Sequence, residues 1–452
     1  MQKFIKNLNC DYEEKISALL NKGFSFALSG ITNCTKLIIL AQLLIKNNKK
    51  LVFVTETEQN ALKFQNDLKK MFEIESVIFP YQDGSIYDTN SKNLYKYARQ
   101  LQIIDNQNAE KIIIIPQKAL FEKFAVKDFF VKNDISISVD DDINVSEIAS
   151  SLVKLGYKKK TLVADVGEFS VRGDIIDVYP LSEHPFRIEL WGDTVTDIRT
   201  FDNSTQRSIE KVKNVKIQPI YKFLLEKDSY KKIEKAIDKE NENQLEMLED
   251  VKSENYFEGI EYYENIFNPN LKPVTELLNS DFIFIFDDYT QFKSRYEQTV
   301  DNLEKQYDEN IKTNLTLNID NKNHLNLSQF LTTVSGFEKI YFDNFISDEF
   351  DVNIELNTEL IPFFASGLDD IAKFVKEKLT QKYHVLISTE YKNRVEEILK
   401  EYEIPYTYNS DEKNAVIITE AIVLAGSIIE DCKLIIITDK ELFNKRSKDI
   451  TA

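Results

Sequence analysis

Residues 29–37, SGITNCTKL, contain some of the residue types that a phosphate-binding loop requires. In the working pattern GxxxxGK[ST], glycines let backbone N–H groups approach phosphate, the lysine binds it and the final hydroxyl binds Mg²⁺. Gly30 and Lys36 are present, but Thr35 replaces the second glycine and Leu37 replaces the hydroxyl. Because leucine cannot bind magnesium, we interpret this loop as the relic of a nucleotide site, with Lys36 as a solvated helix residue.

Two acids, Asp287 and Asp288, follow the apolar run FIFIF at 282–286. Acids at the end of such a strand hold magnesium in many nucleotide-hydrolysing proteins. Since the loop offers no hydroxyl to the metal, we expect these acids to cap or solvate the strand end instead. We therefore predict no catalytic residues, no metal site and no cofactor for this chain.

Three large side chains that suit partner binding lie on successive predicted strands. In FRIELW, the period of two places Arg187 and Trp191 opposite the apolar residues, and in EFSVRG it does the same for Arg172. An exposed tryptophan flanked by arginines is typical of a protein-binding hot spot. The alternative is that these side chains merely cover a sheet, with the arginines paired to Glu189 or Asp174.

The composition limits the classes of protein to consider. The 452 residues are 42% hydrophobic and 29% charged, which indicates a soluble globular chain of about two to four domains. A net charge of −18 lacks the basic character of a primary nucleic-acid binder. Cys10, Cys34 and Cys432 are distant and odd in number, so we expect neither a disulfide framework nor a zinc site. We expect the cysteines to be reduced, and the sequence has neither a signal peptide nor an apolar run long enough to span a membrane. These features predict a cytoplasmic protein without a membrane partner.

The elements that must position these residues form an α/β fold. Strand-like runs such as 51–55 and 112–116 alternate with helical patterns, which predicts a parallel, doubly wound sheet. Strands without intervening helices then indicate an inserted α+β domain, and a small separate α/β domain follows a polar stretch. The predicted segments are the first part of the large domain (1–127), the insert (128–210), the second part (211–315), a linker (316–330) and the C-terminal domain (331–452), which takes in the run KIYF at 339–342.

The stretch GEFSVRGDIIDVYP, followed by FRIELWGDTVTDIRTFDNSTQRSIEKV, resembles a signature shared by the bacterial transcription-repair coupling factor (Mfd) family and its homologue, the excision-repair helicase subunit UvrB. In both families this module docks UvrA. The resemblance implies that Arg172, Arg187 and Trp191 contact UvrA, with Arg199 and Arg207 contributing. The coupling factors usually have phenylalanine where this chain has Trp191, which keeps a large apolar anchor but changes its fit.

The resemblance is closer to the N-terminal portion of the coupling factors than to UvrB. UvrB has an intact phosphate loop and a long hairpin that grips damaged DNA, whereas the segment YQDGSIYDTNSKNLYKYAR is too short for that hairpin. FEGIEYYENIF and LIIITDKELFNKR resemble motifs of the degenerate helicase-like domain and of the small third domain. The RNA polymerase module and the ATP- and Mg-dependent DNA translocase of the family would follow them, so we expect this chain to be a fragment without either.

The resulting hypothesis is a recruitment region that binds UvrA, has no ATPase of its own and brings nucleotide excision repair to stalled RNA polymerase. RNA polymerase and double-stranded DNA would be bound by the family's C-terminal domains. One alternative is an ATP-dependent helicase subunit of UvrB type. Another is a scaffold whose insert serves mainly intramolecular contacts.

Overall fold

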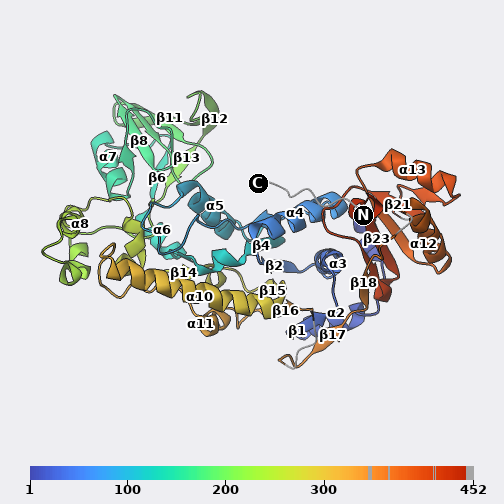
Figure 1. Ribbon diagram of the computed structural model, residues 1–452. Coiled ribbons are helices and arrows are strands. Elements are labelled where there is room, and N and C mark those ends of the chain that lie inside the picture. The colour runs from blue at the N-terminus through green and yellow to red at the C-terminus, as the bar shows by residue number, and fades with distance from the viewer. Residues whose placement is uncertain (345–348, 365–366, 411, 413, 444–452) are drawn as a thin grey trace.

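A parallel sheet of seven strands forms the centre of the computed structural model, which describes residues 1–344, 349–364, 367–410, 412 and 414–443 (Figure 1). All neighbouring strands in this sheet run parallel. Apolar runs such as FIFIF fit strands that are buried on both faces. In spatial order the strands are β17 (Asn353–Glu355), β1 (Phe26–Ser29), β16 (Glu338–Phe342), β15 (Phe282–Phe286), β2 (Lys50–Thr55), β4 (Ile112–Pro116) and β3 (Val77–Ile78).

Both faces of this sheet are covered. In β2, Val52 and Val54 belong to one apolar core while Leu51 and Phe53 belong to another, because successive side chains point to opposite faces. The predicted parallel α/β fold is confirmed. The longer helices of this part are α1 (Gln2–Asn7), α2 (Glu13–Asn21), α3 (Asn33–Ile45), α4 (Glu58–Phe72), α5 (Leu94–Asp105), α10 (Tyr289–Lys312) and α11 (Leu327–Thr333).

One strand lies in a different sheet from the predicted one. β16, which contains the run KIYF, pairs with β1 and β15 in the central sheet, with Phe26 opposite Ile340. β17 then extends the same sheet at its edge. The prediction that KIYF belongs to the C-terminal domain is therefore wrong, because an apolar run does not by itself specify which sheet it completes.

The polar stretch 316–330 is anchored to the large domain by buried residues and runs into α11, so its interpretation as a linker is wrong. Thr316, Leu317, Asn321 and Asn323 are buried. Leu317 N donates to Tyr263 Oη at 3.1 Å, and Asn321 Nδ2 donates to the carbonyl of Tyr262 at 2.6 Å. Asparagine-rich sequence here supplies amides that satisfy a buried backbone, which composition alone does not distinguish from a solvated linker.

The insert contains a sheet of six strands. Its strands are β12 (Ser208–Val212), β11 (Thr194–Phe201), β10 (Phe186–Trp191), β9 (Ile175–Val178), β8 (Glu168–Arg172) and β7 (Lys158–Lys159), in that spatial order. Further elements are α6 (Lys127–Asn133), α7 (Val145–Lys154) and a pair formed by β6 (Ile135–Ser138) with β13 (Asn214–Ile217). The predicted end of the insert at residue 210 thus falls within β12.

The run FSVRGDIIDV is a hairpin of two strands and not one continuous strand. β8 and β9 pair antiparallel, with Arg172 opposite Ile175, and Gly173 and Asp174 form the two-residue turn. Gly173 has φ +60°, a conformation that glycine adopts without steric cost and that two-residue hairpins require. The Gly-Asp dipeptide was therefore a turn signal.

Short elements connect the insert to β15. The motif FEGIEYYENIF forms one 3₁₀ turn and one helical turn with Tyr262 and Tyr263 buried. The acidic helix buries only Gln244, Leu248 and Val251. The elements between the insert and β15 are η2 (Ser229–Lys232), η3 (Glu234–Ala236), α8 (Glu242–Lys252), η4 (Ile260–Tyr263), α9 (Glu264–Phe267), β14 (Lys272–Pro273) and η5 (Val274–Glu276). η1 (Gln117–Phe121) and β5 (Lys123–Phe124) precede the insert, and β5 pairs with β14.

The C-terminal sheet packs one face against the large domain. Leu386 and Ile436 join the core shared with the central sheet, whereas Val385 and Ile435 face a separate core under the sheet's own helices. Its strands are β18 (Thr358–Leu360), β22 (Ser427–Ile429), β23 (Leu434–Thr438), β19 (His384–Ser388), β21 (Val416–Thr419) and β20 (Tyr406–Thr407). Its helices are α12 (Leu368–Thr380), α13 (Lys392–Glu401), η6 (Glu430–Cys432) and α14 (Asp439–Phe443). Residues 444–446 of LIIITDKELFNKR lie outside the described residues.

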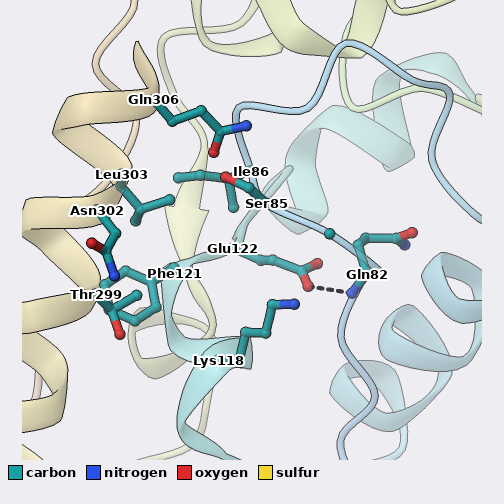
Figure 2. A pocket seen from close by; sticks show the side chains of 11 residues that line it. Gln82, Ser85, Ile86, Lys118, Phe121, Glu122, Thr299, Asn302, Leu303 and Gln306 are labelled. Carbon is teal, nitrogen blue, oxygen red and sulfur yellow. Dashed lines mark hydrogen bonds between the residues drawn. The ribbon is translucent and has the colours of Figure 1, made fainter. Parts of the chain in front are cut away.

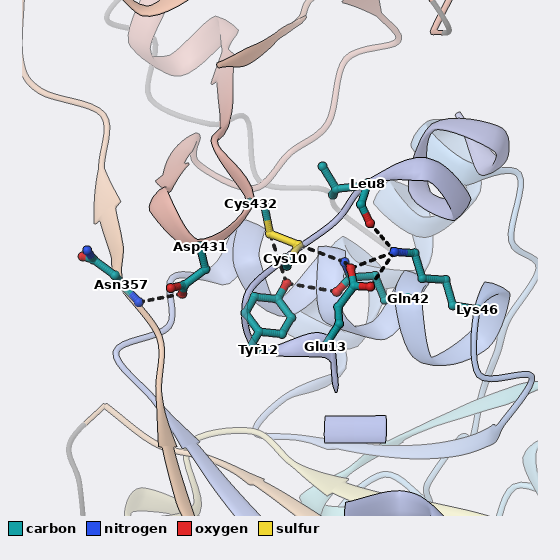
Figure 3. Close-up of a disulfide and its surroundings, with 9 residues drawn as sticks. All are labelled: Leu8, Cys10, Tyr12, Glu13, Gln42, Lys46, Asn357, Asp431 and Cys432. Atoms are coloured by element: carbon teal, nitrogen blue, oxygen red, sulfur yellow. Dashed lines mark hydrogen bonds and ion pairs between the residues drawn. A yellow bond between two sulfur atoms is a disulfide. The ribbon is translucent and has the colours of Figure 1, made fainter. Parts of the chain in front are cut away.

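A disulfide joins the two ends of the fold. Cys10, between α1 and α2, is bonded to Cys432 at the end of η6, across 422 positions of sequence (Figure 3). Asp11 N donates to the carbonyl of Asp431 at 3.0 Å beside it. The prediction of reduced cysteines is wrong for this pair, because distance in sequence does not report distance in the fold. Cys34 is free and buried.

No helix in the described part of the chain has both the length and the apolar character needed to cross a membrane.

Candidate docking face and closed nucleotide site

Strand register places the predicted arginines on one face of the insert sheet. Arg172 lies opposite Ile175, which lies opposite Glu189, and Arg187 lies opposite Arg199. Directly opposite residues in antiparallel strands share a face, so all three arginines belong to the face that carries Glu189. We call this the docking face and define it by Arg172, Arg187, Trp191 and Arg199.

Trp191 is the most exposed large apolar side chain of the described residues. Within β10, Ile188 and Leu190 are buried, whereas the Trp191 side chain is 84% exposed. Gly192 follows with φ +63° and turns the chain into β11. The predicted alternation of this strand is confirmed, and it leaves an indole ring that the fold itself does not cover.

A buried carboxylate orients two of the arginines. Asp177 on β9 is fully buried. It accepts hydrogen bonds from Arg187 Nε at 2.7 Å and Nη2 at 2.9 Å, and from Arg172 Nη2 at 2.5 Å. The bond to Asp177 raises the pKa of Arg187 above its usual value. Two guanidinium groups therefore share one negative charge, and both are fixed in direction.

The two arginines differ in exposure. The Arg187 guanidinium lies 4.8 Å from the centroid of the Phe201 ring and its side chain is 18% exposed, whereas 48% of the Arg172 side chain is exposed. Arg172 is thus available to an acceptor outside the fold, and Arg187 acts from a recessed position. Asp177 was not among the predicted residues, since Asp174 and Glu189 were the expected partners. An aspartate inside the apolar run IIDV, between two arginine-bearing strands, was the available signal.

The other two predicted arginines are placed differently. Arg199 pairs with Glu189 and with Asp197, the latter at 3.3 Å, and Asp197 also binds Lys211 at 2.8 Å. This part of the docking face is therefore balanced in charge. Arg207 is exposed in the connection from β11 to β12 and lies on none of the three strands that carry the other arginines, although its carbonyl accepts from Asp202 N, directly after β11, at 2.9 Å.

The relic phosphate loop is closed by the chain itself. Gly30 has φ +67°, and a Cβ at this position would lie 2.4 Å from the carbonyl oxygen of Leu356. Thr358 Oγ1 donates to the carbonyl of Gly30 at 2.5 Å and accepts from Thr32 N at 3.3 Å. Thr35 N donates to Thr32 Oγ1 at 3.4 Å, which caps α3. Two backbone donors of the loop are therefore already engaged, Thr32 N by Thr358 beyond β17 and Thr35 N by Thr32 of the loop itself.

Lys36 and Asp287 form a buried ion pair. Lys36 Nζ lies 2.5 Å from Asp287 Oδ1, and their side chains are only 9% and 11% exposed. The interpretation of Lys36 as a solvated helix residue is wrong, because the lysine turns inward to neutralise the acid at the end of β15. Asp288 takes the left-handed conformation and accepts from Asn344 Nδ2 at 3.1 Å. Leu37 is fully buried.

Comparisons with known proteins agree with this architecture. Residues 135–223 match the family model described as the UvrB interaction domain. The transcription-repair-coupling factor of Staphylococcus aureus (strain USA300) is 25% identical over 464 residues, covering 95% of this chain and 39% of that protein. The factor of Staphylococcus haemolyticus (strain JCSC1435) is 26% identical over 458 residues, covering 93% of this chain and 38% of that protein.

The predicted resemblance to the N-terminal portion of transcription-repair-coupling factors is confirmed. The chain spans about two fifths of the length of these curated relatives.

Proposed function

We propose that this chain is the recruitment region of a transcription-repair-coupling factor and that its docking face binds UvrA. Family resemblance implies UvrA as the partner of this module. The exposed Trp191 indole, beside arginines fixed in direction by Asp177, is the observation that carries the proposal. Large rigid aromatics and arginines dominate the binding energy of protein interfaces.

The charges of the docking face indicate what the partner offers. Because Arg172 and Arg187 share one carboxylate, one positive charge is not neutralised within this cluster. A carboxylate or a row of backbone carbonyls on the partner would form charge-assisted hydrogen bonds with Arg172. The Trp191 ring would be buried in an apolar recess beside it.

We further propose that the wider role depends on parts of the coupling factors that this chain does not span. Those parts would bind RNA polymerase and double-stranded DNA and would use ATP and Mg²⁺. Within this chain the closed relic site favours recruitment over ATP hydrolysis, since Lys36 is already paired and the loop is already covered.

Calorimetric titration of UvrA into the chain tests the proposal. We expect Arg187→Ala combined with Trp191→Ala to weaken binding by about 2–4 kcal/mol, the scale of interface hot spots. Arg394→Ala combined with Tyr408→Ala is a matched control, because it removes an exposed arginine and an exposed aromatic from the C-terminal domain. Equal affinity of the docking-face variant and the unaltered chain would reject UvrA binding at this face.

A further inference from the structure

A cavity of about 300 Å³ lies between the loop after β3, the end of η1 and one face of α10 (Figure 2). None of its lining residues belongs to the docking face or to the relic phosphate loop. We call it the α10 pocket. It combines an apolar wall, a buried carboxylate and a cation at its rim, and neither the proposed docking nor the closed nucleotide site uses any of these groups.

The apolar wall is rigid and flat. Phe121 and Leu303 are buried, and Ile86 completes the wall from the loop side. The Phe121 ring stacks on Tyr296 with centroids 4.4 Å apart and an interplanar angle of 29°. Only 4% of Phe121 is exposed, so a planar ligand would contact the part of this fixed ring that faces the pocket, beside Ile86.

The carboxylate of Glu122 lies at the inner end of the pocket and is more than nine-tenths buried. Gln82 N donates to Glu122 Oε1 at 2.6 Å, and Gln100 Nε2 donates to Oε2 at 2.9 Å. Each carboxylate oxygen can accept a second hydrogen bond. Among the described residues Glu122 forms no salt bridge; burial raises the pKa of its carboxyl, and the nearby Lys222 charge partly offsets that rise. A ligand with N–H donors would favour the ionised form of this carboxyl.

Lys118 supplies the opposite charge at the rim. Its Nζ lies 5.1 Å from the centroid of the Tyr81 ring, and in the described part of the chain it forms no ion pair. Lys118 and Glu122 come from the same turn of chain (Figure 2). The pocket therefore fits a flat ligand with N–H donors for Glu122 and an anionic group within reach of Lys118.

We propose that the α10 pocket binds a guanine nucleotide unit. The base stacks on the Phe121 wall, its N1–H and exocyclic amino group donate to Glu122, and its phosphate lies near Lys118. Guanine fits because its edge places two donors side by side, which matches a single carboxylate. Adenine presents one donor beside an acceptor at that edge and leaves half of the carboxylate unsatisfied.

Calorimetric titration with GMP and AMP tests the base preference. We expect GMP to bind about tenfold more tightly than AMP. We expect Glu122→Gln to lower the affinity for GMP about tenfold. Gln100 Oε1 has no hydrogen-bond partner. After rotation of the Gln100 amide, its Oε1 can therefore accept a hydrogen bond from the new N–H group, and the variant should fold. Glu261→Gln is the matched control, because Glu261 is also a buried carboxylate but does not line the pocket.

A second variant blocks the pocket without altering its inner end. Asn302 is exposed on α10 at the rim, so Asn302→Trp should abolish GMP binding, whereas Asp301→Trp on the adjacent exposed position should not. An oligonucleotide of nine deoxynucleotides with one central guanine, compared with oligothymidine, shows whether the unit is bound free or within a strand. Failure of both GMP and the guanine oligonucleotide to bind, or binding unaffected by Glu122→Gln and Asn302→Trp, would overturn the proposal.

Discussion

The docking face and the relic phosphate loop both hold cations against aspartate, but they expose them differently. In the insert, Asp177 is shared by two arginines, and almost half of the Arg172 side chain stays exposed. In the loop, Lys36 and Asp287 pair one to one and both are nearly buried. The first arrangement leaves positive charge at the surface, whereas the second neutralises it inside.

The difference shows that an ion pair with aspartate can either hold cations at the surface, as on the docking face, or bury them, as in the relic phosphate loop. A carboxylate shared between two guanidinium groups fixes their directions while leaving N–H donors for a partner, because each guanidinium has five donors. A lysine has three donors on a flexible stem, and at Lys36 its charge is consumed by Asp287. The number of cations per carboxylate therefore distinguishes the two regions.

Removing the shared carboxylate should have the largest effect. Asp177→Ala leaves the recessed Arg187 without a counterion, and we expect the local free energy of unfolding to fall by about 3–5 kcal/mol, as for other broken buried pairs. Hydrogen exchange of the β9 and β10 amides measures this change. Asp174→Ala, in the exposed hairpin turn, should change the local free energy of unfolding by no more than about 0.5 kcal/mol. Similar exchange in both variants would show that Asp177 does not organise the docking face.

Breaking the closed pair should have a slightly smaller effect. Lys36→Met leaves Asp287 unpaired, and we expect a loss of about 3 kcal/mol in the exchange stability of α3 and β15. Asp287→Leu added to Lys36→Met should restore most of it, because a buried pair can be replaced by apolar residues at little cost.

Lys50→Met is the control for this variant. Lys50 at the start of β2 pairs at 2.9 Å with Asp281, directly before β15, but the side chains of this pair are 26% and 53% exposed, so the loss should be within about 1 kcal/mol. ATP hydrolysis or an ATP–Mg²⁺ thermal shift that disappears in Lys36→Met would contradict a closed site.

The sequence was sufficient to predict local structure and the docking face, but not the closed relic phosphate loop. Apolar runs such as FIFIF and IIIIP predicted central strands, and the period of two in FRIELW predicted that Trp191 and Arg187 point away from the core. These are short-range properties, because side-chain direction in a strand depends only on position along it. The hairpin turn at Gly173 could also have been recognised from its Gly-Asp dipeptide.

Long-range pairing could not be derived in this way. Lys36 and Asp287 are 251 residues apart, and Thr358 reaches the loop from 328 residues beyond Gly30. Nothing in the local pattern of KIYF states that β16 completes the central sheet. The closed region consists almost entirely of such contacts, whereas the docking face is built from strands adjacent in sequence. This is why the docking face was predictable and the closure was not.

Reducing the disulfide tests whether the closed relic phosphate loop depends on this covalent link. We expect a smaller loss of stability than for Lys36→Met. Cys10–Cys432 ties the segment after α1 to the C-terminal sheet. We expect reduction to cost about 2 kcal/mol, at the lower end of the usual range, since the two parts also share an apolar core. Thermal unfolding with and without reductant measures it. The variant with Cys10→Ser and Cys432→Ser should be insensitive to reductant, and an equal response in both proteins would exclude a role for the link.

Trp191→Ala should have the smallest effect on stability, and it sharpens the comparison most. A side chain that is 84% exposed gives up little burial when truncated, so the exchange stability of the insert should change by no more than about 0.5 kcal/mol. UvrA affinity should nevertheless fall, because an aromatic anchor becomes buried only in the complex. Leu190→Ala is the opposite control: Leu190 is buried in the same strand, and its truncation should cost about 2–5 kcal/mol of stability. If Trp191→Ala destabilised the sheet as much as Leu190→Ala, the indole would be part of the fold and not a surface held ready for a partner.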